Sequence, residues 1–347
     1  MPTRSGKILV IRMSSLGDLI LLVPLLRTIR NSFQEKEITL LTKEKYAGLF
    51  SDQKFLDRLI LLKRGNLREL VRLRSELSHE HFDLIIDAHH VIRSNILFHT
   101  LNAKKKLQIR KNEAAKTALI KGKVNWYKHI VSQSRRYAEI AKRLEITMNT
   151  GSAAELPVPD AAAARAERLF EGNSLAGRTV IALAPGARWP TKVWPKEHFT
   201  MLIHEVSARG FAPVLIGGAE EAASNAEIAK QSGSSLLDLT GALSIMESAA
   251  VLRRCAALVT NDSAPLHLAE AVGTPVVAFF GPTVREFGYF PRLERSIALE
   301  VKLPCRPCSR NGARACPYGT KECLVAIRPE EALTALLTVL GAGRSLS

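Results

Sequence analysis

Several side chains of this sequence have a type and position suited to acid–base chemistry, and Asp18 is the first. The segment Met13–Asp18 (MSSLGD) follows the apolar stretch Lys7–Arg12, so it lies at the carboxyl end of a predicted strand. A carboxylate placed there can act as a general base in a ligand-binding cleft. The alternative interpretation is a helix start, because serines cap helices and an acidic residue in the first turn suits the helix dipole.

The second half of the chain contains two loops suited to binding an anion. Lys192 lies in the loop after the predicted strand Thr179–Ala184, where a lysine can pair with a phosphate as a point charge. Asp262 and Ser263 follow a later strand and begin a helix whose first amide groups can bind a diphosphate, with His267 one turn further on. A solvated lysine and a packed helical histidine are the alternatives.

A pair of glycines at another strand end indicates close approach to a ligand. In Leu215–Glu221 (LIGGAEE) the two glycines let the backbone approach a nucleotide, and Glu220 can accept the hydroxyl pair of a ribose. A tight turn explains the two glycines equally well.

Four of the five cysteines lie in one loop near the C-terminus, with the spacing C-x2-C-x7-C-x6-C. Four thiolates at this spacing can hold a zinc ion tetrahedrally, and disulfides or free thiols are the alternatives. The four are Cys305, Cys308, Cys316 and Cys323. The fifth, Cys255, ends an apolar helix and is predicted to be a core residue. So few cysteines do not make a disulfide scaffold, and a reducing compartment is expected.

The charge of the chain predicts an anionic partner. Its 49 Lys and Arg residues against 33 Asp and Glu residues give a net charge of +16. Thirteen of these cations and only two acids fall between Lys104 and Arg143, with Trp126 and Tyr127 among them. Nucleic acid, anionic lipid and a phosphorylated glycan are the candidate partners, and a solvated basic face is the alternative.

Several classes of protein are excluded by the same sequence. The longest apolar run, Leu19–Leu26, is far shorter than the about 20 residues that a spanning helix needs. Arg12 and Asp18 interrupt the N-terminal segment that would form a signal peptide. No P-loop motif occurs, and the turn after the first strand is not G-x-G-x-x-G, which argues against P-loop and nicotinamide enzymes.

Short β-rich runs alternate with helical patterns along the chain, which indicates βαβ units and parallel sheets. The predicted strands are Lys7–Arg12, Ile38–Thr42, Arg58–Leu62, Phe82–Asp87, Thr179–Ala184, Ala212–Ile216, Ala256–Thr260 and Pro275–Phe280. A change of composition around Gly151–Gly177 marks the boundary between two halves. We therefore expect an N-terminal domain over 1–165, a second domain over 166–330, and a C-terminal helix and tail over 331–347.

In their order along the chain, these motifs resemble one known family. The segments Lys7–Asp18, the loop through Lys192, the GGAEE stretch and Asn261–Thr283 are similar to those of the ADP-heptose lipopolysaccharide heptosyltransferases of glycosyltransferase family 9, particularly its second-heptose branch. The resemblance implies an α/β, GT-B fold in which two doubly wound Rossmann-like domains face a central cleft. It also implies an inverting transfer that requires no metal cofactor, leaving a possible zinc ion on the cysteines a structural role.

The resemblance assigns roles to individual residues. Asp18 matches the base that deprotonates the acceptor. The nucleotide-sugar is assigned to Arg188, Lys192, Glu220, Leu243, Asp262, Ser263, Ala264 and His267, and the acceptor to Ser15, Gly17, Arg93, Lys104, Lys105, Lys106 and Arg110. This chain departs from the family at Ala264, where a glycine is common, and at Ala187 and Arg188, where some relatives have threonines that contact phosphate.

The function expected from this resemblance is heptose transfer from ADP-heptose to the inner core of lipopolysaccharide on Kdo-lipid A. The enzyme is expected on the cytoplasmic face of the inner membrane, held peripherally at its anionic surface, with no nucleic acid as partner. The alternatives are a family 9 transferase with another nucleotide-sugar or glycan and, from a different class, a basic nucleic-acid-binding protein.

Overall fold

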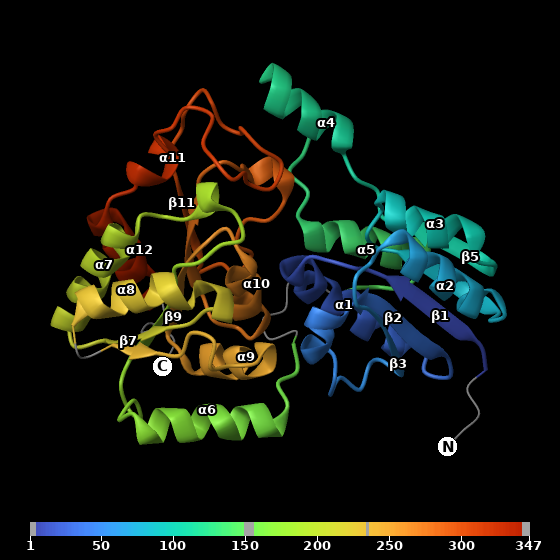
Figure 1. Cartoon of the computed structure of the whole chain (residues 1–347), viewed down its shortest axis with the longest axis horizontal. Helices are drawn as coiled ribbons and strands as arrows, with labels where there is room; N and C mark the ends of the chain where they lie inside the picture. Colours follow the sequence, from blue (N-terminus) through green and yellow to red (C-terminus); the bar gives the residue numbers. More distant parts are fainter. Residues whose placement is uncertain (1–4, 149–155, 234–235, 342–347) are drawn as a thin grey trace. The chain divides into compact units, whose positions relative to one another are not determined.

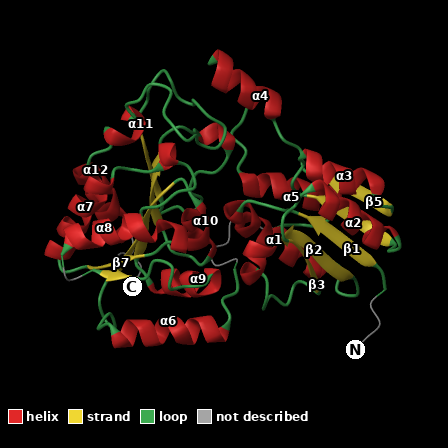
Figure 2. Cartoon of the chain, in the orientation of Figure 1, coloured by secondary structure: helices red, strands yellow, loops and turns green. Residues whose placement is uncertain are grey.

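The computed structural model describes residues 5–148, 156–233 and 236–341, and these form two units, each built on one parallel sheet (Figures 1 and 2). The first unit comprises residues up to Asn112 together with a segment that begins at Ser132. The second comprises Glu113–Val131 and the C-terminal half of the chain.

The first unit has a five-stranded sheet in the order β3-β2-β1-β4-β5, with all neighbours parallel. Its strands are β1 (Lys7–Ile11), β2 (Glu37–Lys43), β3 (Arg58–Leu62), β4 (Phe82–Asp87) and β5 (Ala103–Gln108). The central strands are buried on both faces, which explains why they read as continuous apolar runs. β5 differs, because it is an edge strand that carries three lysines.

Helices cover this first sheet. They are α1 (Leu16–Ser32), α2 (Leu67–Ser78), α3 (Ile92–Thr100) and α5 (Gln133–Arg143), with a 3-10 helix, η1, at Glu44–Leu49. Leu70, Leu73 and Leu77 of α2 join Leu97 of α3 in a core against the strands, while α1 and α5 pack together. Continuous apolar strands and amphipathic helices thus bury one another.

The second unit has a six-stranded parallel sheet in the order β11-β10-β9-β6-β7-β8. The strands are β6 (Val180–Ala184), β7 (Ala212–Leu215), β8 (Leu237–Asp238), β9 (Ala257–Asn261), β10 (Val276–Phe280) and β11 (Ile297–Glu300). Trp194 is fully buried under this sheet, stacked on Phe279 at a ring-centroid distance of 4.1 Å.

The helices of the second unit form two groups. α7 (Lys196–Ala208) packs with α8 (Ala222–Ser232) and with α12 (Pro329–Gly341), while α9 (Ile245–Arg254) packs with α6 (Asp160–Gly172) and α10 (Ala264–Ala271). The remaining helical segments are α4 (Glu113–Thr117), α11 (Glu322–Val325), a π-helical turn η2 (Ala118–Gly122), and the 3-10 turns η3 (Pro190–Lys192), η4 (Ala219–Glu221) and η5 (Arg285–Phe287).

Each sheet has a point at which successive strands are added on opposite sides. In the first sheet this point lies between β1 and β4, and in the second it lies between β6 and β9. Loops at the carboxyl ends of two such strands diverge and leave a crevice, where open parallel sheets bind their ligands. The loops that follow these four strands are therefore the places to look for a site.

The structure confirms the eight predicted strands to within about two residues. It adds β5, β8 and β11, which the sequence analysis did not predict. Residues 113–131 group with the second unit, which also contains α6, packed on α9, and α12. In the described part of the chain, no helix is long and apolar enough to cross a membrane.

Candidate functional site

The candidate base lies just after β1, in the first turn of α1. Asp18 is 8% exposed, and its Oδ2 atom accepts hydrogen bonds from the Ser15 hydroxyl at 2.7 Å and from the Ser15 backbone N–H at 3.3 Å. The Nη2 atom of Arg12 lies 2.6 Å from the same oxygen. The carboxylate thus closes the first helical turn, as a helix start requires, and also pairs with a guanidinium.

Arg12 connects Asp18 to the loop that follows β4. While its Nη2 pairs with Asp18, its Nη1 donates to the backbone carbonyl of Ala88 at 2.5 Å. From α5, the hydroxyl of Tyr137 donates to the backbone carbonyl of Asp18 at 3.2 Å. Because β1 and β4 flank the switch point of the sheet, this one arginine joins the loops that follow these two strands. The sequence analysis had not assigned Arg12 to the site.

The loop after β4 is built around the buried carboxylate of Asp87. Its Oδ1 accepts the backbone N–H groups of His89 and His90, both at 2.9 Å. Its Oδ2 accepts from the Ser94 hydroxyl at 3.0 Å and from the Gln108 amide at 2.8 Å. These bonds satisfy a carboxylate that would be costly to bury alone, and they hold the loop in one conformation.

His89 adds an uncharged ring to this edge of the sheet. Its Nδ1 accepts the backbone N–H of Met13 at 3.4 Å, so the neutral ring carries its proton on Nε2. Burial, followed by the positive charge of Arg12, lowers the pKa of His89 to about 3. The ring therefore packs beside Arg12 without adding a second positive charge.

Part of the expected acceptor set lies at this same edge. Ser15 is the N-cap residue of α1, and Gly17 immediately precedes Asp18 in the first turn. Arg93 lies in the first turn of α3 and donates to the backbone carbonyl of Gly65 at 3.0 Å.

The expected acceptor lysines lie elsewhere in the unit. Lys104, Lys105 and Lys106 are on the edge strand β5, and the Lys104 ammonium lies 2.8 Å from Asp83, near the amino end of β4. Lys104 is thus at the opposite end of the strands from Asp18, because parallel strands all run the same way. Lysines on an edge strand prevent pairing with another chain, which accounts for their position. Arg110 is exposed, two residues beyond β5.

In the second unit, Lys192 and Asp262 form an ion pair at the carboxyl edge of the sheet. The Nζ atom of Lys192 lies 2.6 Å from Oδ2 of Asp262 and 3.3 Å from its backbone carbonyl. The hydroxyl of Thr283 donates to the same Oδ2 at 2.6 Å. These three residues follow β6, β9 and β10, so three loops meet at one carboxylate. Thr283 is a partner that the sequence analysis did not assign.

The loop that carries Lys192 is held at both ends by one buried side chain. Asn261 donates through Nδ2 to the Pro185 carbonyl at 2.6 Å and accepts through Oδ1 the backbone N–H of Trp194 at 3.0 Å. Arg188, between these ends, is exposed, with its guanidinium 5.4 Å from the ring centroid of Trp189. The structure therefore presents Lys192 rigidly, while Arg188 lies on the surface of the same loop.

Helix α10 begins immediately after Asp262. Ser263 is its N-cap residue, with its hydroxyl 3.4 Å from that of Thr260, and Ala264 is the first helical residue. His267 is 5% exposed, and its ring centroid lies 6.0 Å from that of Tyr289. The free N–H groups at a helix N-terminus favour negative charge, and here the Lys192–Asp262 pair lies next to them.

At the end of β7, the more constrained acid is Glu221 rather than the predicted Glu220. Glu220 is exposed, whereas Glu221 accepts the backbone N–H of Gly218 at 2.9 Å, and burial raises its pKa. A Cβ atom on Gly186 would lie 1.6 Å from the Glu221 carboxylate, so this glycine lets the loops after β6 and β7 meet. Leu243 is half-buried, in the loop before α9.

The cysteine-containing loop braces the loop of Lys192. The hydroxyl of Thr191 donates to the Ala313 carbonyl at 3.0 Å and accepts the Ala313 N–H at 2.8 Å. Gly312 packs so closely that a Cβ atom there would lie 2.6 Å from Cβ of Trp189. Farther back, Arg306 donates to the carbonyls of Gly281 and Thr283. The loop therefore supports both residues that contact Asp262.

The four cysteines of that loop fit a metal site only in part. Burial alone would raise the pKa of Cys316, but the backbone N–H groups of residues 318–321 outweigh it and lower the pKa, which favours a thiolate. Burial raises the pKa of Cys308, and that of Cys323 to about 11, which favours their neutral thiols. Within the described ranges, no group of three His, Cys, Asp or Glu residues is placed to hold a metal ion, and all five cysteines are free thiols.

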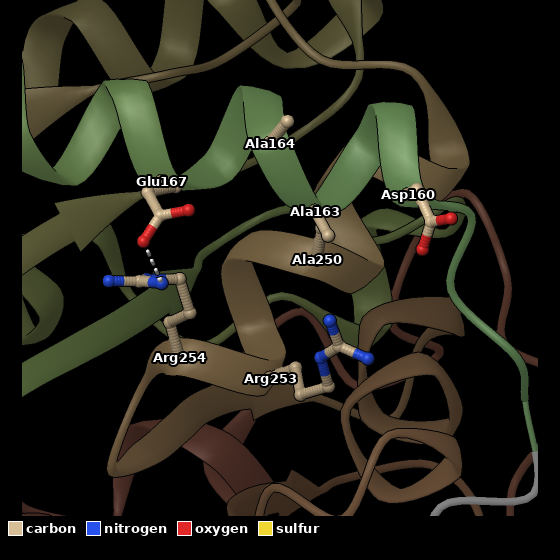
Figure 3. Close-up of a pocket in the computed structure, with 7 residues that line it drawn as sticks. All are labelled: Asp160, Ala163, Ala164, Glu167, Ala250, Arg253 and Arg254. Carbon is tan, nitrogen blue, oxygen red and sulfur yellow. Dashed lines mark ion pairs between the residues drawn. The ribbon is translucent and has the colours of Figure 1, made fainter.

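A separate cavity of about 390 Å³ lies between α6 and α9 (Figure 3). It is lined by Asp160, Ala163, Ala164, Glu167, Ala250, Arg253 and Arg254. None of the residues predicted for the site takes part in its lining, and Glu167 and Arg254 partly neutralise each other across it at 3.8 Å.

Comparison with known proteins gives a family for this architecture. The model of "Glycosyltransferase family 9 (heptosyltransferase)" matches residues 70–318. Lipooligosaccharide heptosyltransferase 2 of Haemophilus influenzae is 32% identical over 139 residues, which cover 38% of this chain and 40% of that protein. The chain matches less than half the length of the first curated relatives.

Solved structures match over nearly the whole chain. A glycosyl transferase family 9 protein from Veillonella parvula has a TM-score of 0.78 at 22% identity, covering 99% of both chains. The E. coli ADP-heptose lps heptosyltransferase II has a TM-score of 0.72 at 20% identity, covering 97% of this chain and 99% of that one. This likeness confirms the expected GT-B fold, with its two parallel α/β sheets.

The depressed pKa of His89 predicts a dependence of stability on pH. Because the folded-state pKa of about 3 lies below the ordinary value of 6.5, the stabilisation is complete above pH 6.5 and is lost as the pH falls toward 3. Between about pH 7 and pH 5, the wild type should lose about 1–2 kcal/mol more unfolding free energy than His89→Gln. Urea unfolding at both pH values measures this, and the exposed His204→Gln should behave as the wild type. Equal losses in wild type and His89→Gln would contradict the burial of a neutral ring.

Proposed function

The chain belongs to glycosyltransferase family 9, and we propose that it is an inverting transferase that moves a heptose from ADP-heptose to the inner core of lipopolysaccharide. The names of its relatives support this donor and acceptor. The observation that carries the proposal is the Lys192–Asp262 pair next to the N-terminus of α10, because a cation and helix amides at a switch point suit a nucleoside diphosphate.

On the acceptor side, the proposed step is removal of a hydroxyl proton by Asp18. The hydroxyl oxygen then attacks the anomeric carbon from the face opposite ADP, the bond to the diphosphate oxygen breaks, and the configuration inverts. Arg12 and Ser15 both bind Oδ2 of Asp18, so the carboxylate is oriented before the acceptor arrives. Such preorganisation removes part of the cost of aligning the base in the transition state.

On the donor side, the proposed role of Lys192 is to stabilise the negative charge that grows on the departing diphosphate. Asp262 and the brace of Thr191 against Ala313 hold this lysine in place. The ammonium and the first amides of α10 would then face the leaving group together. Exposed Arg188, on the same loop, adds positive potential nearby.

The proposed acceptor also places the enzyme in the cell. The inner core and lipid A carry carboxylates and phosphates, which suits a chain with a net charge of +16. We infer that the enzyme works at the cytoplasmic face of the inner membrane, bound peripherally.

Asp18→Asn tests the base. The amide keeps the shape of the side chain but cannot accept the proton, so kcat should fall by about 10²–10⁴-fold while ADP affinity stays unchanged. Turnover of ADP-heptose with heptose-free core glycolipid, measured by mass spectrometry, gives kcat. Asp160→Asn is the matched control, since Asp160 is also an acid in the first turn of a helix. Near-normal turnover by Asp18→Asn would reduce Asp18 to a capping residue.

Lys192→Ala tests the diphosphate contact. Loss of one charge-assisted contact should weaken ADP binding by about 1.5–3 kcal/mol and slow the transfer. Calorimetric titration with ADP measures the first effect. Lys196→Ala is the control, because Lys196 also pairs with an acid, Glu227, but on the surface of α7. Unchanged ADP affinity and turnover in Lys192→Ala would remove this lysine from the site.

A metal test addresses the cysteine loop. We propose that transfer requires no metal ion, so full activity should persist after treatment with a chelator. A structural zinc on Cys305, Cys308, Cys316 and Cys323 stays a prediction, for which metal analysis of reduced, untagged protein should find about one zinc per chain. Cys308→Ser should then lower the melting temperature without abolishing transfer. If metal analysis finds no zinc, the prediction of a structural zinc is wrong, and the hydrogen bonds of the loop alone hold it in place.

A further inference from the structure

A short segment of the second unit exposes apolar side chains that have no role in the proposed transfer. In the stretch after η2, Val124 is 50% exposed, Trp126 is 60% exposed and Ile130 is 53% exposed. Large apolar side chains that gather on a surface mark a contact with another apolar phase or partner more often than scattered ones do. Figure 1 shows α4, which leads into this stretch.

The base of the segment is bound firmly to the second unit. Lys123 donates to the carbonyls of Cys305 and Pro307, each at 2.7 Å, and Asn125 donates to Glu286 at 2.9 Å. In α4, Glu113 pairs with Arg310. The backbone next to the exposed side chains is therefore anchored, since Lys123 and Asn125 lie on either side of Val124 in sequence.

All the acidic or basic side chains of the segment, histidine aside, are lysines. Between residues 114 and 131 there are four lysines and no acidic residue. Lys123 is used in the anchor, and Lys116 lies 4.9 Å from the ring centroid of Phe287. Lys121 and Lys128 are exposed and flank Val124 and Trp126 in sequence, with Ile130 two residues after Lys128.

The basic stretch Lys104–Arg143 is not uniform in the structure. Lys104 pairs with Asp83, Lys105 donates to the Arg143 carbonyl, and Lys111 donates to the His90 carbonyl. The cations of that stretch are also divided between the two units. The part that combines exposed cations with exposed apolar side chains is residues 121–130.

We propose that residues 121–130 dock on an anionic membrane surface, with Trp126 and Ile130 entering the interface and Lys121 and Lys128 contacting lipid phosphates. Tryptophan is the side chain that bilayer interfaces favour, since its ring is apolar while its N–H stays near the headgroups. Lysines around it are attracted to anionic lipid. A second protein copy would bring the same positive charge to the patch and be repelled. The docking deepens the proposed function and rests on it, because the acceptor proposed there is a membrane glycolipid.

Co-sedimentation with vesicles tests the docking. The wild type should bind vesicles that contain phosphatidylglycerol, and bind phosphatidylcholine vesicles at least about tenfold more weakly. Trp126→Ser/Ile130→Ser should lower the partition coefficient on the anionic vesicles about tenfold or more. The matched control is Leu67→Ser/Val71→Ser on α2, where the two side chains are 64% and 56% exposed and the charged residues are mixed, three arginines with Glu69 and Glu76.

A second pair of variants separates charge from apolar insertion. Lys121→Ala/Lys128→Ala should weaken binding to anionic vesicles and reduce its salt dependence, while Lys54→Ala/Lys230→Ala, which removes the same charge elsewhere, should do so less. The assignment to this segment would be overturned if Lys121→Ala/Lys128→Ala and Lys54→Ala/Lys230→Ala lost the same affinity for anionic vesicles. It would also be overturned if the two apolar double variants lost the same affinity.

Tryptophan fluorescence locates the insertion. The chain has three tryptophans, of which Trp194 is buried. The emission should shift to shorter wavelength when anionic vesicles are added, and the shift should vanish in Trp126→Phe although that variant still binds. A shift that persists in Trp126→Phe would overturn the proposal.

Transfer to a water-soluble, deacylated acceptor distinguishes this proposal from the proposed function. The docking variants should keep their wild-type kcat on that acceptor and lose activity only on acceptor in vesicles. Absence of transfer with intact vesicle binding would refute the function and not the docking. Transfer to vesicle-borne acceptor that is unaffected by Trp126→Ser/Ile130→Ser would refute the docking and not the function.

Discussion

The polar side chains of the candidate site gather at strand ends because both sheets are parallel and their central strands are buried on both faces. A strand in such a sheet has no solvent-facing side, so its interior positions must be apolar. Asp18, Asp87, Lys192 and Asp262 all lie just at or beyond the ends of strands that flank a switch point. The packing that stabilises each unit thereby also determines where its chemistry can be placed.

Two nearly buried ion pairs, one in each unit, follow from that constraint. Arg12–Asp18 and Lys192–Asp262 both have side chains that are at most 13% exposed. Burying two charges costs desolvation energy that their attraction only partly returns, so such pairs add little stability by themselves. Here each pair joins loops from different strands, through Ala88 in one unit and Thr283 in the other. Their contribution is geometric: each places a charged group in one position before a ligand binds.

In the second unit, the cysteine-containing loop also fixes the position of the polar residues at the strand ends. The cysteine-containing loop holds the segment of Lys192 through Thr191 and Ala313, and Arg306 holds the turn that leads to Thr283. The same loop accepts the anchor of the 113–131 segment through the carbonyls of Cys305 and Pro307. One loop thus connects the proposed diphosphate site to the proposed membrane segment by hydrogen bonds alone.

Local sequence pattern was sufficient for the eight predicted strands and for the positions of Asp18, Lys192 and Asp262 in the loops that follow them. A buried parallel strand must be an apolar run, and a polar turn followed by a helix marks its carboxyl end. Edge strand β5 escaped prediction because its lysines hide the pattern, and its register then placed Lys104 beside Asp83, at the opposite end of the strands from Asp18.

Partners brought together across the sheets were decided only by the tertiary structure. Arg12 meets Asp18 and Ala88, and Thr283 meets Asp262, because neighbouring parallel strands end side by side, although they are far apart in sequence. The close approach of Glu221 to Gly186, a residue of another loop, likewise depends on the tertiary structure. The hydrophobic periodicity of a sequence identifies single helices and strands. Which side chains pair across a sheet depends on strand order and register, which long-range packing determines.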